Sequence, residues 1–440
     1  MQHKTLLGLG ALGLCLAAGP ALATNGMISH GYSPLDKAVA GATTAYHFDA
    51  LVTATNPAGL AFVDDSLVAG VSLFMPDRHY SSAGDASPLF AIGPQQIQSS
   101  GDLFVIPAMA WAYRLDERQT LGLALYGNGG MNTRYEGGSA TLFDANGNSM
   151  TLPGTFGDGT AGVDLKQMFI NATYAHQFKD DQALALSLLL AGQSFKAYGI
   201  SNFAGFSLDP DHLSDQGTDY AYGVGVKLGY QGKLTDALWL GAAYQPRIRM
   251  SNFDNYRGLF PDAGRFDVPA MANLGLAWQA SDAWLWLLDV QHIFYSDVAA
   301  IANTADAMYS CMQGVSRACL GGSTSTGFGW QDMTVYKLGL QYQQADWSLR
   351  AGISYGKSPI RDSEILFNIL SPGLIEWHYT LGASYQISDS LSLHGSYMYA
   401  PSNSLSGRNS LSGQAEGSQS QTLTIAMSQQ ELDLGLSWRF

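Results

Sequence analysis

The chain has 440 residues, of which 13% are charged and 11% are aromatic, and it contains 50 glycines. The apolar and aromatic content argues against a disordered chain. The 22 basic and 36 acidic side chains give a formal net charge of -14, which would repel a phosphate backbone, so a nucleic-acid partner is excluded.

The first 23 residues have the layout of a secretory signal peptide. Lys4 supplies a positive charge, an apolar stretch follows it, and Ala21 to Ala23 form a cleavage site of small residues. We therefore expect the mature chain to begin at Thr24. No later run of roughly 18 or more apolar residues occurs, which excludes a helical membrane protein.

Residues 24–62 show no alternation and instead contain several short helix starts. Ser33 is a candidate N-cap followed by Pro34, and Asn56 is followed by Pro57 in the same arrangement. Asp49 can cap a further turn. Helices this short are not stable alone in water, so we expect the segment to fold only when the rest of the protein encloses it.

From about residue 66 onward, apolar and polar residues alternate with a period of two, which predicts β-strands. Tyr222, Val224 and Leu228 share one face of such a segment, and Lys227 and Gln231 share the other. Short polar turns alternate with long loops rich in Gly, Ser and Asn. This combination is typical of an outer-membrane barrel with an apolar outer face and a polar lumen.

Fourteen segments alternate in this way. Because an open sheet edge leaves unpaired backbone groups in hydrocarbon, the segments must close into a barrel. We therefore predict an all-β fold: a 14-stranded antiparallel transmembrane β-barrel over residues 63–440, in the bacterial outer membrane, plugged by a small helical unit at residues 24–62. The predicted strands are 66–74, 102–115, 119–127, 164–178, 183–197, 218–231, 237–250, 265–279, 283–297, 332–344, 347–357, 373–387, 391–400 and 427–440.

The third of these segments is interrupted by Gly127, Asn128, Gly129 and Gly130. Consecutive glycines favour a bulge or an inward bend that interrupts the ladder of a strand. The alternative is that these residues merely begin the next external loop.

Two apolar clusters lie in the predicted external loops. The stretch "FAGFSL" contains Phe203 and Phe206, and the stretch "ILFNIL" contains Leu366 and Phe367. Exposed apolar patches rimmed by polar residues usually mark binding sites, so we expect these loops to form a capture groove for ligand. The alternative is that the loop residues pack only against each other.

Three cations on predicted strands are candidates to bind the carboxylate head of a ligand, namely Lys196, Arg247 and Arg350. We expect them to face the lumen, because a Lys or Arg facing lipid at mid-depth costs about 2 to 4 kcal/mol. The alternative is that they are solvated lumen charges paired with neighbouring acids.

Cys311 and Cys319 are the two cysteines that follow the predicted signal peptide, and they lie in one Gly and Ser-rich loop. In an oxidising compartment this spacing favours a disulfide that closes a small loop. Metal binding would need further ligands nearby, so we expect no metal and no cofactor.

Several stretches carry a resemblance to a known family. They are "NGMISHGYSPLDKAVAGA", "DALVTATNPAGLAFV", "GNGGMNTRYEGG", "FDVPAMANLGLAW" and the terminal Phe440. They resemble the FadL-type (FadL/TodX) family of outer-membrane transporters for long-chain fatty acids and hydrocarbons, over essentially the whole mature chain. The most specific element is the segment that ends in Asn56, Pro57, Ala58 and Gly59, which in that family forms a hatch inside the barrel.

The resemblance implies passive uptake of hydrophobic compounds, either long-chain fatty acids or aliphatic and aromatic hydrocarbons. Substrate would be caught between the loops, bind inside the barrel and leave sideways through a gap in the wall as the hatch shifts. In that family the gap belongs to an early strand with a kink, which makes Gly127 to Gly130 the candidate opening. The implied partners are outer-membrane lipid and, through Phe440, the barrel-assembly machinery.

Two other functions share part of this pattern. A general hydrophilic porin would share the alternation but has no reason to carry a helical plug. An outer-membrane enzyme is suggested by "GISYG" at 352–356, but this match lies inside an alternating strand, whereas a nucleophile elbow needs a strand-to-helix turn. We expect no enzyme activity.

Overall fold

The structure is a computed structural model that describes residues 24–84, 90–144, 148–411 and 421–440. The predicted signal peptide at residues 1–23 lies outside the described residues. Within the described ranges, none of the helices has the length and apolar character needed to traverse a bilayer.

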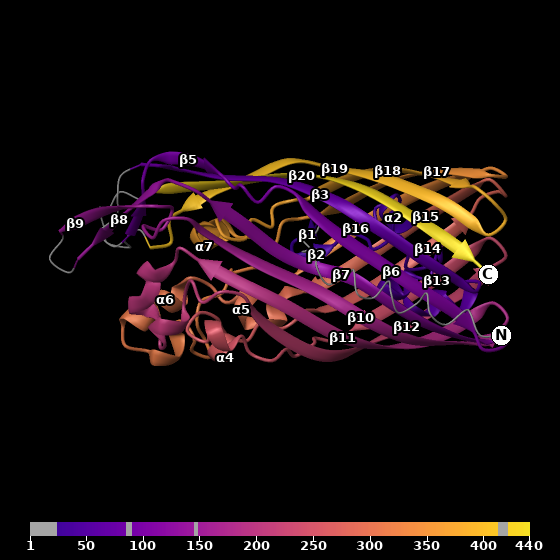
Figure 1. Cartoon of the computed structure of the whole chain (residues 1–440), viewed down its shortest axis with the longest axis horizontal. Coiled ribbons are helices and arrows are strands. Elements are labelled where there is room, and N and C mark those ends of the chain that lie inside the picture. The colour runs from indigo at the N-terminus through magenta and orange to yellow at the C-terminus, as the bar shows by residue number, and fades with distance from the viewer. Residues whose placement is uncertain (1–23, 85–89, 145–147, 412–420) are drawn as a thin grey trace, which may run out of the picture.

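Fourteen long strands form a closed antiparallel barrel (Figure 1). Each strand pairs with the next along the chain, and the last pairs with the first from Arg439↔Ser66 to Thr422↔Ala83, which closes the ring. The predicted fold class is confirmed. The strands are β3 (Ser66–Ala83), β6 (Phe104–Arg114), β7 (Gln119–Tyr135), β10 (Ala161–Lys179), β11 (Gln182–Tyr198), β12 (Asp219–Thr235), β13 (Leu238–Gln245), β14 (Ala270–Gln279), β15 (Trp284–Phe294), β16 (Met333–Gln343), β17 (Trp347–Gly356), β18 (Trp377–Gln386), β19 (Leu391–Arg408) and β20 (Thr422–Arg439).

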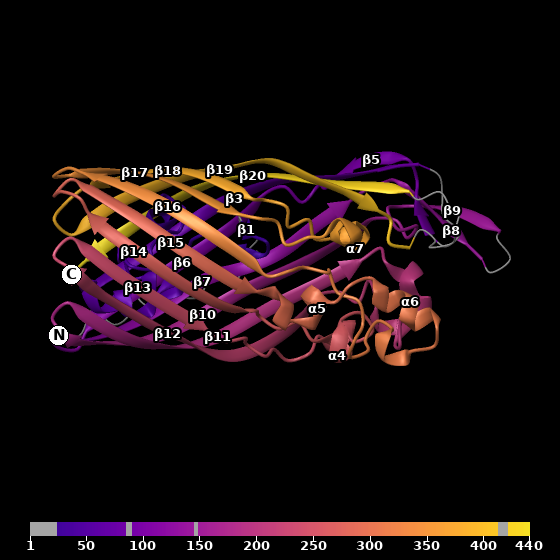
Figure 2. The ribbon, with the colours of Figure 1, turned by 180° about the vertical axis from the view of Figure 1, so that it is seen from behind.

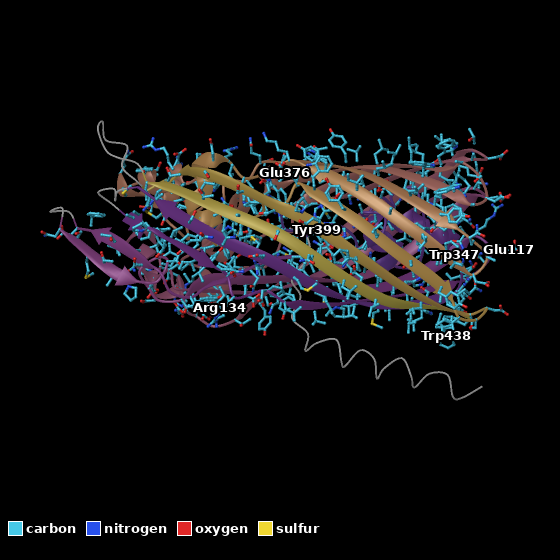
Figure 3. All side chains as sticks on the ribbon, turned by 90° about the horizontal axis from the view of Figure 1, so that it is seen from above. Glu117, Arg134, Trp347, Glu376, Tyr399 and Trp438 are labelled. Carbon is cyan, nitrogen blue, oxygen red and sulfur yellow. A yellow bond between two sulfur atoms is a disulfide. The ribbon has the colours of Figure 1, made fainter. Side chains whose placement is uncertain are left out.

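Side chains alternate across the wall as the sequence predicts. On β12, Tyr222 and Val224 are 66% and 63% exposed on the outer face, whereas Lys227 is 2% exposed on the inner face. Trp347 and Trp438 lie at the rim that carries the short turns (Figure 3). Amphipathic rings at that level suit a membrane interface, so the outer surface has the apolar band and aromatic rim of a membrane barrel.

The strands differ in length from those predicted. β7 and β19 continue to Tyr135 and Arg408, well beyond residues 127 and 400. Their extensions are rich in Gly, Ser and Asn, which have low strand propensity, and the ladder to the neighbouring strand holds them extended instead. β13 ends early at Gln245 because Pro246 has no N–H to donate to a ladder.

The two ends of the barrel differ (Figure 2). Short turns such as 115–118 and 344–346 lie at the end that carries the C-terminus, and long loops cover the other end. This matches short periplasmic turns and long external loops. The loop elements are β4 (Phe90–Ile92), β5 (Gln95–Gln98), β8 (Ser139–Phe143), β9 (Ser149–Pro153), the helices α4 (Pro261–Gly264), α5 (Ala299–Ala302), α6 (Asp306–Met312) and α7 (Ile365–Asn368), and the 3-10 helices η2 (Ser201–Phe206), η3 (Pro210–His212), η4 (Asp254–Tyr256), η5 (Tyr295–Asp297), η6 (Ser316–Ala318) and η7 (Asp362–Glu364).

The N-terminal segment, residues 24–62, packs against inward-facing positions of strands around the ring (Figure 1). It lies against Gly435 on β20, Gly339 on β16 and Gly241 on β13. A Cβ atom at Gly241 would lie 1.9 Å from the Thr44 carbonyl oxygen, so only glycine permits this approach. The elements of the segment are β1 (Thr24–Asn25), β2 (Ile28–Ser29), α2 (Pro34–Lys37), α3 (Val52–Thr55) and the 3-10 helix η1 (Pro57–Phe62).

Candidate functional site

A buried ion pair network holds the N-terminal segment to the wall. Ser33 caps α2 by accepting from the Asp36 amide at 3.1 Å, and Lys37 in the same helix reaches β20. The Lys37 ammonium lies 2.5 Å from Glu431 Oε1 and 2.9 Å from Asp433 Oδ1. Burial alone would lower the pKa of Lys37, but the two carboxylates outweigh burial and raise it above its ordinary value. Lys37 therefore stays charged inside the barrel.

Two further lumenal cations bind backbone carbonyls of the segment. The Lys337 ammonium lies 3.3 Å from the carbonyl oxygens of His30 and Gly41, and Lys227 donates to the carbonyl of Ala54. Both lysines are buried. Along the ring of strands, β12 lies nearly across from β20 and β16 lies four strands from it, so the segment is anchored at several places around the wall.

Asn56 lies where the segment meets β12 and is fully buried. Its Nδ2 donates to the carbonyls of Thr44 at 2.6 Å and Tyr230 at 2.9 Å. Its Oδ1 accepts from the Ala58 amide at 3.1 Å and so caps η1. One side chain therefore fixes the turn that contains Pro57, Ala58 and Gly59 and joins it to the wall.

A polar cavity of about 340 Å³ opens between the segment and β17 to β20 at the short-turn end. Burial lowers the pKa of His47 to about 4 and raises the pKa of Asp49 to about 6, and both residues line this cavity. Arg350 on β17 also lines it, stacks over the Phe48 ring at 4.9 Å and donates to the Ser384 hydroxyl at 2.7 Å. Arg350 thus faces the lumen and contacts the N-terminal segment.

The wall is interrupted between β6 and β7. Their ladder runs from Arg114↔Thr120 to Ala108↔Tyr126, and a single bridge, Ser99↔Tyr135, joins the two chain segments again nearer the loops. Between these points, residues 101–107 and 127–133 form no strand pairs with each other, and the structure describes both stretches in full.

The interruption coincides with a bulge in β7. On its other edge β7 pairs with β10, and the register shifts between Gln167↔Gly129 and Met168↔Gly127, which leaves Asn128 as an extra residue. The Asn128 side chain is buried and donates to Gln167 at 3.3 Å. The strand does not end at residues 127–130, and these residues bend it.

The N-terminal hairpin β1–β2 takes the place of β6 beside the bulge. Ile28 pairs with Gly129, and the Gly130 amide donates to the Met27 carbonyl at 3.1 Å. A Cβ atom at Gly129 would lie 2.2 Å from the Met27 oxygen. The hairpin therefore depends on a glycine at position 129.

The external loops enclose an apolar cavity of about 60 Å³. Phe203 from η2 and Phe367 from α7 both line it, with ring centroids 5.7 Å apart, so the structure brings two of the predicted loop candidates together. Leu366 is fully buried but does not line this cavity, and Phe206 is partly buried against the apolar core. The remaining lining residues are Val163, Phe195, Ile200, Leu213, Leu259, Phe260, Ala300, Leu320, Thr326, Gly327, Phe328 and Leu370.

Two of the predicted lumenal cations lie elsewhere. Lys196 is exposed on the outer face of β11, in phase with Leu190, and its ammonium lies 5.5 Å from the Tyr198 ring. The strand extends above the apolar band, where a charge on the outer face costs little. Arg247 lies beyond the Pro246 break and 3.7 Å from Asp267, so the alternation does not reach it. The prediction that these two side chains face the lumen is wrong.

Sequence analysis missed Arg78, a buried inward-facing cation on β3. The predicted strand ended at residue 74, whereas β3 continues to Ala83. Arg78 shares the phase of Ser72 and Phe74, which are also buried. Extending the alternation by four residues, from Phe74 to Arg78, would have found it.

Cys311 and Cys319 form a disulfide with a Cα–Cα distance of 4.7 Å. The bridge joins α6 to the residue after η6 within one external loop. No group of three or more His, Cys, Asp or Glu side chains in the described ranges is arranged to hold a metal ion.

Comparison with known proteins gives one family model, described as Outer membrane protein transport protein (OMPP1/FadL/TodX), which matches residues 14–399. A putative outer membrane protein of Neisseria meningitidis serogroup B is 22% identical over 430 residues, covering 89% of this chain and 90% of that relative.

Two of the similar solved structures come from pseudomonads. The Pseudomonas putida toluene transporter TodX is 18% identical, with a TM-score of 0.64, and the match covers 93% of this chain and 99% of TodX. A Pseudomonas aeruginosa FadL homologue is 16% identical, with a TM-score of 0.64, and the match covers 94% of this chain and 100% of the homologue. At these identities the likeness shows a shared fold.

Proposed function

Because the chain belongs to the OMPP1/FadL/TodX family of outer membrane transport proteins, we propose that it takes up hydrophobic compounds passively, through a sideways exit in its own wall. Members of this family are transport channels rather than enzymes, and the protein is located in the outer membrane. The proposed cargo is a long-chain fatty acid or an aliphatic or aromatic hydrocarbon.

The observation that carries this proposal is the interruption between β6 and β7. A membrane barrel normally leaves no strand edge unpaired, because each unpaired backbone group is costly in hydrocarbon. Here the edge of β7 beyond Tyr126 faces the β1–β2 hairpin instead of β6. An interruption of the wall at one place, beside a segment that is not itself part of the barrel, suits passage of an apolar molecule into lipid.

Capture would take place in the apolar loop cavity. Phe203 and Phe367 are two of the phenylalanines that line it, and an incoming apolar ligand would contact them. Burying each methylene contributes roughly 0.8 kcal/mol, so a long acyl chain gains on the order of 10 kcal/mol once it is fully buried. The loop cavity, at about 60 Å³, holds only part of such a chain, and the rest would be buried deeper in the barrel. Binding that strong requires a second step that weakens it.

The N-terminal segment would supply that step as a hatch. In this proposal residues 24–62 form the hatch and residues 63–440 form the barrel. Within the hatch, the turn from Asn56 to Gly59 stays fixed and the β1–β2 hairpin moves. Moving the hairpin off Gly129 would free the edge of β7 beside the gap. The ligand would then leave into the bilayer, which spares it a return to water.

The proposed uptake function implies two partners. Outer-membrane lipid would receive the cargo at the gap. Phe440, which ends the chain beside the last strand, would be the signal for the barrel-assembly machinery. A general hydrophilic porin remains the second candidate function, and the packing of residues 24–62 against the inner wall counts against it.

Uptake measurements in cells that lack their own channel for hydrophobic compounds test the proposal. Cells producing this protein should accumulate a labelled fatty acid, alkane or monoaromatic faster than control cells. Phe203→Ala and Phe367→Ala should slow that uptake, and Phe143→Ala, outside the cavity on β8, should not. Equal uptake with and without the protein, for all three classes, would refute the proposal.

A further inference from the structure

Arg78 is a buried cation whose hydrogen-bonding capacity is mostly unused. It is 3% exposed, and its Nη1 donates to the carbonyl of Asn132 on β7. Its Nε and Nη2 have no hydrogen-bond partner within the described ranges, and none of the described carboxylates lies within 4 Å of it. The carboxylates of Asp77 and Asp102 act on this charge, but only from beyond 4 Å. A buried guanidinium that no carboxylate contacts directly is costly, so a partner is expected at this position.

The free atoms of Arg78 form a defined recognition edge. Nε and Nη2 lie on one side of the planar guanidinium, and their two N–H groups point in parallel. This spacing matches the two oxygens of a carboxylate, which accepts two charge-assisted hydrogen bonds from such an edge. A neutral hydrocarbon offers nothing to these donors.

Arg78 lines a small cavity next to the interruption in the wall. The cavity has a volume of about 30 Å³ and is also lined by Phe74, Met131 and Met427, and no acidic side chain lines it. That volume admits a group the size of a carboxylate but not a whole ligand. An attached apolar tail would therefore extend out of the cavity.

The position of the cavity indicates where the tail would go. Gly130, Met131 and Asn132 in its lining belong to the stretch of β7 that is not paired with β6. The Arg78 guanidinium lies 5.8 Å from the ring of Phe104, the first residue of β6. Arg78 therefore lies between the two edges of the gap, with apolar side chains on both sides.

Other inward-facing cations are already engaged. Lys37 pairs with two carboxylates, and Lys227 and Lys337 donate to carbonyls of the N-terminal segment. Arg350 lies in the cavity at the short-turn end, which Asp49 and Asp346 also line. Arg78 differs from all of these because its cavity contains no acid.

We propose that Arg78 binds the carboxylate of an amphiphilic acid at the wall gap, with the apolar tail directed toward the gap. Arg78 would then select a monocarboxylate with a long apolar tail over a neutral hydrocarbon as the cargo. The proposal rests on the proposed uptake function and names the substrate class of the same pathway.

Binding to the purified full chain in lipid nanodiscs tests the proposal, at a pH where the acid is ionised. The probes are dodecanoate, its methyl ester and dodecanol, which share the tail and differ in the head group. The wild-type protein should bind dodecanoate about ten-fold or more tightly than the ester, because charge-assisted hydrogen bonds are lost in the ester. Equal affinity for the three probes would overturn the proposal without any variant.

Variants then assign the preference to the residue. Arg78→Met should lose the preference for dodecanoate while binding dodecanol within about two-fold of wild type, which also shows that the barrel is folded. Arg78→Lys should keep part of the preference, since it retains charge but not the paired edge. The matched control is Arg134→Met, at an exposed arginine on β7 that pairs with Glu136 (Figure 3), and it should change neither affinity.

Two outcomes would refute this proposal without refuting the uptake function. If Arg78→Met weakens dodecanoate and dodecanol equally, Arg78 has only a structural role through Asn132 and the proposal fails. If the preference survives in Arg78→Met, the carboxylate binds elsewhere and the proposal also fails. In both cases cells can still take up hydrocarbons, so the proposed function is tested separately by the uptake measurement.

Discussion

Asn56 joins the turn at Pro57 to Gly59 both to Thr44 in the N-terminal segment and to Tyr230 in the wall. Replacing it with alanine removes two donors and the cap of η1, and it leaves the carbonyls of Thr44 and Tyr230 without that partner. We expect Asn56→Ala to destabilise the segment by about 1 to 3 kcal/mol. Hydrogen exchange of residues 46–62 should speed up, while the strands keep their protection. The control Asn255→Ala, at an exposed position in η4, should change nothing.

His47 and Asp49 give the segment a pH dependence with opposite signs. The pKa of His47 is lowered to about 4, so its contribution to stability is complete above pH 6.5 and is lost as pH falls toward 4. The pKa of Asp49 is raised to about 6, so its contribution is complete below about pH 3.8 and is lost as pH rises through 6. The two trends oppose each other over the same range.

Single variants separate the two contributions. Asp49→Asn should leave a segment that loses protection as pH falls from 6.5 to 4, and His47→Gln should leave one that loses protection as pH rises from 4 to 6. Hydrogen exchange of residues 46–62, referred to the exchange rate of an unstructured chain at each pH, measures both. If both variants keep the wild-type pH profile, these two groups do not control the segment.

Individual side chains also show what the sequence can predict. Lys227 and Arg350 face the lumen as the alternation indicates, because each lies well inside a regular strand. Lys196, Arg247 and Arg78 were misplaced or missed, because each lies near the end of a strand that is longer or shorter than predicted. The alternation predicts which side of the wall a side chain faces, but only for residues inside a strand, so the strand ends must be known as well.

At the scale of elements, the β1–β2 hairpin depends on close approach to β7. Gly129→Ala would place a Cβ atom 2.2 Å from the Met27 oxygen, whereas Gly192→Ala on β11 would meet its nearest atom, the Met168 oxygen, at 3.9 Å. We expect Gly129→Ala to expel the hairpin and Gly192→Ala to leave it in place. Limited proteolysis near residues 24–29 should detect the difference. Equal resistance in both variants would show that the hairpin tolerates a methyl group there.

The elements differ in how well the sequence predicts them. The helix starts at Ser33 and Asn56 were found because the capping residue and the following proline are local signals. The bulge at Asn128 was only one of two readings, because consecutive glycines favour a bend and a loop alike. The long-range pairs with β10 and with Ile28 decide between the two, and sequence pattern does not contain them.

At the scale of the whole molecule, ion conductance shows whether residues 24–62 block the barrel. An empty barrel of this size would conduct, whereas residues 24–62 pack against strands around the inner wall. In planar bilayers the complete protein should show no large steady conductance, and a form lacking residues 24–62 should show one. A large steady conductance from the complete protein would favour the porin alternative.

Strand number, closure and the identity of the two ends could all be predicted from the sequence, because each follows from periodicity and from the cost of unpaired backbone in lipid. The position of the wall gap could not. It depends on which residues of β6 and β7 fail to pair, and Pro107 and Asn128 signal this only once the register is known.

Removing the bulge tests the sideways exit most directly. Deletion of Asn128 makes the register of β7 with β10 continuous, so the strand can run straight beside β6 and the gap should close. Asn128→Ala keeps the extra residue and serves as the matched control. Uptake of a labelled hydrophobic compound should fall to the level of cells without the protein in the deletion variant and stay near wild type in Asn128→Ala. A folded, membrane-inserted deletion variant that transports at the wild-type rate would contradict a sideways exit at this gap.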